Sequence, residues 1–129
     1  MVKNSVWIQQ EICGVKLYVY RSNVQNATTI YFLDGDQFEG PFNHWIIKHQ
    51  PPLNFVLLNA NNRTDDYTPW PLQTSETMPM DFGGKAEEHL SLITTHVIPF
   101  CESEYGFTSS AEKRVIGGYS LGGLFSLYA

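Results

Sequence analysis

The sequence predicts an α/β domain built on a mostly parallel sheet, and three observations support this prediction. Three short runs, at 29–33, 54–62 and 113–120, contain consecutive apolar or β-branched residues that do not alternate with polar ones. Such runs are typical of strands buried on both faces of a parallel sheet. Helical candidates and turns separate these runs, which gives the order β-β-β-α-β-α-β-α. The length of 129 residues, with 43% hydrophobic and 16% charged residues, is ordinary for one small globular domain.

The first elements are predicted to form an antiparallel hairpin. The runs 6–12 and 15–22 are rich in β-formers and are separated only by Cys13 and Gly14. Cys13 and Cys101 are too few and too far apart for a metal motif or a dense disulfide framework, so we expect two buried free thiols.

The clearest helix is predicted from about Lys85 to about Tyr105. Its apolar residues recur at spacings of three and four and form one stripe: Ala86, Leu90, Ile93, Val97 and Phe100. Pro99 lacks a backbone donor, so a kink or break is expected there, and Gly106 is expected to end the helix. The preceding segment, 61–84, contains three prolines and two glycines and is long enough to suggest that it lines a site.

Charge and hydropathy exclude several classes of partner. The net charge is −5 and the eight basic residues are scattered, so the sequence indicates no nucleic-acid partner. The apolar runs are strand-sized, well below the roughly 20 residues that a membrane helix needs, and polar residues interrupt the N-terminal region. We therefore predict a cytoplasmic protein without a membrane partner.

The stretch "GYSLG", residues 118–122, fits G-x-S-x-G directly after a predicted strand and before the apolar run "LFSLYA". In this context a sharp strand-to-helix turn exposes Ser120. Residues larger than glycine at positions 118 and 122 would collide across the turn. The helix N-terminus and the Leu121 N–H could then stabilise a developing negative charge. The glycine spacing fits neither a dinucleotide fingerprint nor a phosphate loop, and the remaining alternative is a structural turn with an idle serine.

Four blocks together resemble the esterase D-like branch of the α/β-hydrolase fold, which includes enterochelin-type esterases, S-formylglutathione hydrolases, feruloyl esterases and mycolyltransferases. These blocks are "TTIYFLDGDQFEG", "NRTDDYTPWP", "GGKAEEHLSLITTHVIPFCESEYGF" and "KRVIGGYSLGGLFSLYA". The resemblance implies that Ser120 is the acyl-accepting nucleophile and that the backbone N–H groups of Leu121 and Asp36 form the oxyanion hole.

Further site residues follow from the same resemblance. Tyr67 and Trp70 would line the acyl or leaving-group pocket, and Tyr119, beside the serine, would also contact the substrate. The alternative for the 63–70 block is a structural loop folded on itself. No cofactor and no metal site are expected.

The serine needs a base and an acid that residues 121–129 do not contain, since they include no Asp, Glu or His. His89 and His96 are seven positions apart and are expected to be helix-surface or helix-edge residues. We therefore expect residues 1–129 to form one incomplete α/β-hydrolase domain, truncated just after the nucleophile turn, with the triad acid and histidine C-terminal to it. The exposed sheet edge would be covered by the missing C-terminal half or by a homo-oligomer.

Three functions remain open. The first is a serine esterase acting on a small-molecule ester, with this chain alone inactive. The second is a non-catalytic fragment or interaction module that keeps the turn for structural reasons. The third is an acyltransferase that uses the same serine, because nothing in the sequence separates water from another acyl acceptor.

Overall fold

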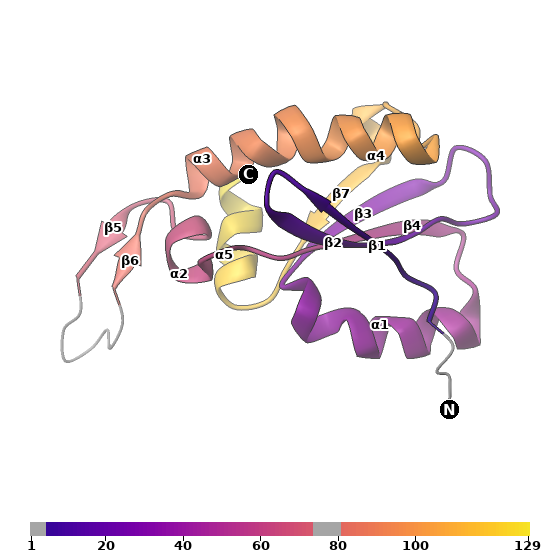
Figure 1. Ribbon diagram of the computed structural model, residues 1–129, viewed down its shortest axis with the longest axis horizontal. Coiled ribbons are helices and arrows are strands. Elements are labelled where there is room, and N and C mark those ends of the chain that lie inside the picture. Colours follow the sequence, from indigo (N-terminus) through magenta and orange to yellow (C-terminus); the bar gives the residue numbers. More distant parts are fainter. Residues whose placement is uncertain (1–4, 74–80) are drawn as a thin grey trace.

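The computed structural model describes residues 5–73 and 81–129. Its central sheet has five strands, and Figure 1 shows how the helices are arranged around it. The strand order is β1-β2-β4-β3-β7. The strands are β1 Ile8–Ile12, β2 Val15–Tyr20, β3 Thr28–Leu33, β4 Leu53–Leu58 and β7 Arg114–Gly117. β3 runs parallel to β4 and β7, whereas β2 runs antiparallel to β1 and β4. The predicted α/β architecture is confirmed.

The β1–β2 hairpin turns on Cys13 and Gly14, which both have positive φ (51° and 81°). Two such residues in succession match the twist of the flanking strands and close a tight hairpin. This geometry places Cys13 at an exposed tip, so the expectation that both thiols are buried is wrong for Cys13 and holds for Cys101.

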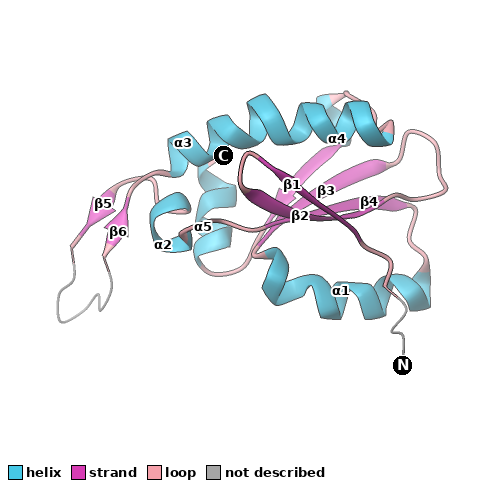
Figure 2. Cartoon of the chain, in the orientation of Figure 1, coloured by secondary structure: helices cyan, strands magenta, loops and turns pink. Residues whose placement is uncertain are grey.

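Helices cover both faces of the sheet (Figure 2). α1, Gly35–His49, packs through the buried Ile46 on one face, together with Tyr18, Phe55 and Leu57. On the other face lie α3 Ala86–Leu92, a π-helical turn Ile93–Val97, α4 Ile98–Tyr105 and α5 Leu121–Tyr128. The core between them includes Val19, Leu33, Val56, Ile93 and Phe125.

The long helix continues past Pro99 without the expected break, but its backbone departs from α-helical geometry just before that residue. The π-helical turn ends just before α4, and Pro99 lies in the first turn of α4. Since Pro99 offers no N–H, one carbonyl of the preceding turn lacks its usual donor, and the wider π register accommodates this loss without ending the helix. Gly106, with φ 72°, ends α4 as predicted.

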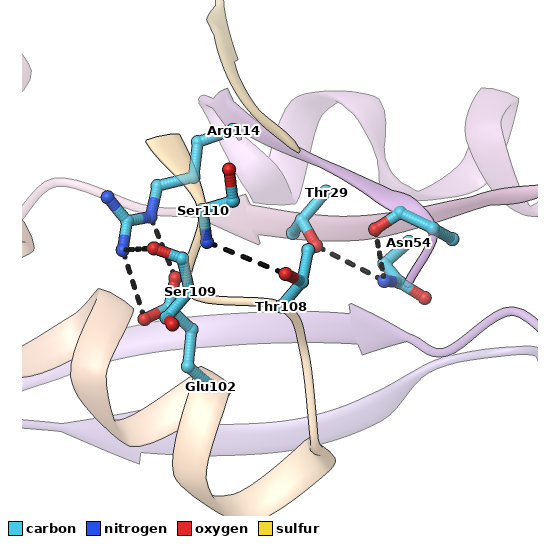
Figure 3. A network of polar contacts seen from close by, with 8 residues as sticks. Thr29, Asn54, Glu102, Thr108, Ser109, Ser110 and Arg114 are labelled. Atoms are coloured by element: carbon cyan, nitrogen blue, oxygen red, sulfur yellow. Dashed lines mark hydrogen bonds and ion pairs between the residues drawn. The ribbon is translucent and has the colours of Figure 1, made fainter. Parts of the chain in front are cut away.

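A polar network fixes the start of β7 at the amino edge of the sheet (Figure 3). Arg114, the first residue of β7, makes a two-pronged ion pair with Glu102 of α4, with N–O distances of 2.7 and 3.1 Å. Its guanidinium also donates to the carbonyl of Ser109 at 2.8 Å. Beside it, the buried Asn54 donates to Thr29 Oγ1. The strand that precedes Ser120 is thereby anchored to the long helix.

The segment between β4 and α3 contains regular structure over its described residues, 59–73 and 81–85, and the remainder of the predicted site-lining segment 61–84 lies outside the described residues. It contains the short helix α2, Arg63–Asp66, and a two-stranded ribbon of β5, Pro71–Leu72, and β6, Phe82–Gly83. A 3₁₀ turn, Ala111–Lys113, leads into β7. Over the described part of the chain, none of the helices has the length and apolar character that spanning a membrane requires.

Candidate active site

Ser120 stands at the junction between β7 and α5 in an unusual backbone conformation. Its φ is 58° and its ψ is −119°, a region that residues with a Cβ rarely occupy. Strain of this kind persists only where the surroundings impose it, and it clusters at functional sites. Leu121, the next residue, begins α5, so its N–H belongs to the first helical turn, which lacks intrahelical acceptors.

The glycines around Ser120 are required by close backbone contacts. A Cβ on Gly118 would lie 2.5 Å from the carbonyl carbon of Gly122 and 2.6 Å from its oxygen. A Cβ on Gly122 would lie 3.3 Å from the Cβ of Leu33. The predicted collision is therefore present at Gly118, whereas Gly122 mainly lets α5 approach β3.

The loop that follows β3 lies beside this turn. β3 and β7 are parallel neighbours with Phe32 opposite Gly117, so their carboxyl ends lie at the same edge of the sheet. Asp34 has a left-handed conformation (φ 57°) and occupies the N-cap position of α1, where its side chain makes no capping hydrogen bond. Its side chain, 9% exposed, receives two hydrogen bonds from the Arg63 guanidinium, at 3.0 and 2.9 Å. The block that contains Arg63 thus braces the loop next to the serine.

The N–H of Asp36, predicted to be the second oxyanion donor, already has a partner. It donates to Asn59 Oδ1 at 2.7 Å. Asn59 directly follows β4, whose carboxyl end lies at the same edge. Asp36 lies in the first turn of α1, directly after β3, rather than in a loop. Its N–H is not free as the resemblance implied, because a neighbouring carboxamide accepts it.

The Asp36 carboxylate is held by two side chains from β2. Tyr18 donates its hydroxyl to Oδ1 of Asp36, and Lys16 Nζ lies 2.9 Å from the same oxygen. These hydrogen bonds, that of Tyr18 first, lower the pKa of Asp36, and those that Lys16 makes with Tyr18 and Asp36 raise the pKa of Lys16. The sequence offered no signal for this cluster, because its members come from separate elements.

Tyr67 is not a surface residue of the pocket, contrary to the expectation. Its side chain is fully buried, and its hydroxyl accepts a hydrogen bond from the N–H of Asp34 at 3.1 Å. Its ring packs against Phe125 of α5, with centroids 5.7 Å apart. Burial raises the pKa of Tyr67. The structure therefore favours the alternative of a structural loop for this residue.

Trp70 and Tyr119, the other two residues expected to contact the substrate, have exposed side chains. Trp70 is 55% exposed and precedes the β5–β6 ribbon, and Tyr119, next to the serine, is 66% exposed. The rings of Tyr119 and of Phe38, in the first turns of α1, make a T-shaped contact with centroids 6.4 Å apart. This contact brings the start of α1 close to the serine.

His89 is a buried residue, which corrects its expected position on the helix surface. It packs between Tyr67 and Phe125, with centroids 5.7 and 5.3 Å away, and its Nε2 has no partner within the described residues. Burial lowers its pKa. His96, on the same long helix, is exposed, as expected.

A pocket of about 370 Å³ opens at the carboxyl edge of the sheet. It is lined by Asp34, Asp36, Gln37, residues 59–61 and Arg63. A larger pocket, of about 550 Å³, lies at the opposite edge, between the 21–27 segment and the end of α4. The smaller pocket lies at the edge of the sheet where β7 ends, and Asp34 and Asp36, but not Ser120, contribute to its lining.

Comparison with known proteins places this geometry in a family. Residues 9–129 match the family described as "Putative esterase". The chain belongs to this esterase family. The protein YbbA of Bacillus subtilis (strain 168) is 33% identical over 106 residues, which are 82% of this chain and 41% of YbbA.

Solved structures resemble this esterase-family chain in fold. The BES protein of Bacillus cereus superposes with a TM-score of 0.76 at 21% identity, covering 99% of this chain and 56% of that protein. An IroE-like serine hydrolase of Shewanella oneidensis gives 0.74 at 20% identity, with 95% and 45% covered. The enterobactin esterase FES of Shigella flexneri gives 0.64 at 18%, with 89% and 28% covered. The fold is that of the α/β-hydrolases, and the chain spans about half the length of these relatives or less.

Proposed function

We propose that this chain carries the nucleophile of a serine carboxylic-ester hydrolase. The observation that carries the proposal is the conformation of Ser120, φ 58° and ψ −119°, on a glycine turn between β7 and α5. Holding a residue with a Cβ in this backbone conformation costs roughly 1–3 kcal/mol. Glycine would avoid this cost in a turn where the serine has no catalytic role.

In this proposal Ser120 Oγ attacks the ester carbonyl while a base takes its proton, and the tetrahedral oxyanion forms beside the α5 N-terminus. The N–H of Leu121 donates to that oxygen, and the N–H of Asp36 is the second donor. Each such donor contributes about 3 kcal/mol to catalysis. The alcohol leaves with a proton, and water then releases the acid from the acyl-enzyme.

The general base and its carboxylate partner are proposed to come from sequence outside residues 1–129. Among the described residues, no histidine or carboxylate hydrogen-bonds to Ser120 Oγ, and the only buried histidine, His89, packs on α5 between two rings. The related proteins are longer than this chain, which leaves room for both groups. The edge of β7 not paired with β3 is the proposed place for a further strand.

The substrate is proposed to be a small-molecule ester that enters at the carboxyl edge, past Tyr119 and Trp70. In the pocket there, Arg63 and nearby Lys16 are each paired with a carboxylate, so neither is a free cation. The cytoplasmic location stays part of the proposal, supported by the two free thiols.

A labelled fluorophosphonate tests this function on the native gene product and on the 129-residue chain. We expect the native product to be labelled at Ser120, to hydrolyse a short-chain aryl ester, and to lose both activities in Ser120→Ala. The non-catalytic alternative predicts that the native product is neither labelled nor active while remaining folded.

A further inference from the structure

The side chain of Asn59 bridges two backbone groups at the carboxyl edge of the sheet. Its Oδ1 accepts the N–H of Asp36 at 2.7 Å, and its Nδ2 donates to the carbonyl of Lys16 at 3.3 Å. Its own N–H donates to the same carbonyl at 3.1 Å. The end of β4 is therefore tied both to β2 and to the first turn of α1.

The orientation of this carboxamide follows from its neighbours. Rotating the group by half a turn would set Nδ2 against an N–H and Oδ1 against a carbonyl oxygen, and both contacts would be repulsive. The oxygen of Asn59 is consequently the group that faces the Asp36 N–H.

The N–H held by Asn59 lies close to the serine turn. Phe32 of β3 pairs with Gly117 of β7, so the residues that follow the two strands leave the sheet side by side. Phe38, two residues after Asp36, meets the ring of Tyr119. An ester carbonyl bound at Ser120 would approach this region.

We propose that Asn59 is a positioning residue that occupies the Asp36 N–H in the resting protein and must release it when an oxyanion forms. This inference rests on the proposed function. One N–H makes one linear hydrogen bond, so Asn59 Oδ1 and the oxyanion compete for the same donor. The oxyanion wins because a charged acceptor bonds more strongly than a neutral amide.

The structure leaves space for this exchange. Asn59 lines the 370 Å³ pocket, and its side chain is only partly buried. The first turn of α1, in contrast, is held in place by Tyr18 and Lys16 at the Asp36 side chain and by the Asp34–Arg63 pair two residues earlier. The mobile partner in the exchange is therefore the carboxamide, while the N–H stays in place.

The test compares Asn59→Ala and Asn59→Asp in the native gene product, with Asn23→Ala, an exposed asparagine at the opposite edge of the sheet, as the control. Removing the competing acceptor should raise the rate of fluorophosphonate labelling and kcat for an aryl ester roughly three- to tenfold, with KM little changed. Aspartate offers a charged acceptor to the same N–H, so Asn59→Asp should lower both rates. Asn23→Ala should leave them unchanged.

A purely structural role for Asn59 predicts lower rates in both Asn59 variants, and that result would overturn the inference. Hydrogen exchange of the Asp36 N–H, followed by NMR, supplies a readout that needs no activity. The N–H should be protected in the wild type and lose protection in Asn59→Ala. If the Asp36 N–H exchanges freely in the wild type, the hydrogen bond to Asn59 does not exist and the inference fails. If the N–H is protected but the wild type shows neither labelling nor ester hydrolysis, the proposed function is wrong, and the role of Asn59 is wrong with it.

Discussion

Replacing Gly118 by alanine tests the serine turn most sharply on the structural side. The new Cβ would lie 2.5 Å from the carbonyl carbon of Gly122 and 2.9 Å from its Cα. Carbon atoms pack favourably at about 3.5–4.0 Å, so the overlap is roughly 1 Å and involves backbone on both sides. Since neither atom is the flexible end of a side chain, we expect Gly118→Ala to lower the free energy of unfolding by about 3 kcal/mol.

Gly123→Ala is the matched control, because it makes the same chemical change inside α5. Its Cβ would meet its nearest neighbour, the carbonyl oxygen of Gly118, at 3.5 Å, an ordinary contact. Alanine is the better helix former, so this variant should gain about 0.5–1 kcal/mol. Urea unfolding of both variants measures this difference of about 3.5–4 kcal/mol, which corresponds to a melting temperature roughly 14 °C lower for Gly118→Ala than for Gly123→Ala. Equal stability of the two variants would refute the packing argument.

Three further predictions concern the surroundings of the turn. Ser120→Gly should be more stable than Ser120→Ala by about 1 kcal/mol in urea unfolding, because glycine relieves the positive φ of 58°; equal stability would mean that the backbone is relaxed. Arg63→Met should cost about 2 kcal/mol in the same assay, because the nearly buried Asp34 loses its partner while Arg63 itself is 40% exposed, and adding Asp34→Asn should recover part of the loss. Because burial lowers the pKa of His89 in the folded protein, the unfolded chain binds a proton at this histidine first as the pH falls below about 6.5, and the free energy of unfolding should decrease over that range. The control variant His96→Gln should show the same decrease as the wild type. His89→Phe should remove the part of the decrease that this histidine contributes.

The sequence predicted the parts of the fold that depend on local patterns. The apolar runs at β3, β4 and β7, the turn at Cys13–Gly14 and the stripe of the long helix each lie within one stretch of chain. The serine turn belongs to the same class, because the glycine spacing and the flanking strand are contiguous.

The errors arose where contacts between distant segments decide the outcome. Tyr67 was expected in the pocket, but its burial depends on α5 and on the N–H of Asp34, 33 residues away. The Asp36 N–H was expected to be free, but its partner Asn59 is 23 residues further along the chain. His89 is buried because α2 and α5 pack against α3, which no periodicity of α3 alone reveals.

The central claim is that Ser120 is an activated nucleophile, and covalent labelling tests it most directly. A fluorophosphonate should add to the native gene product once, at Ser120, as shown by intact mass and peptide mapping, and the adduct should be absent from Ser120→Ala. Absence of labelling in the folded native product, or labelling that persists in Ser120→Ala, would contradict the account.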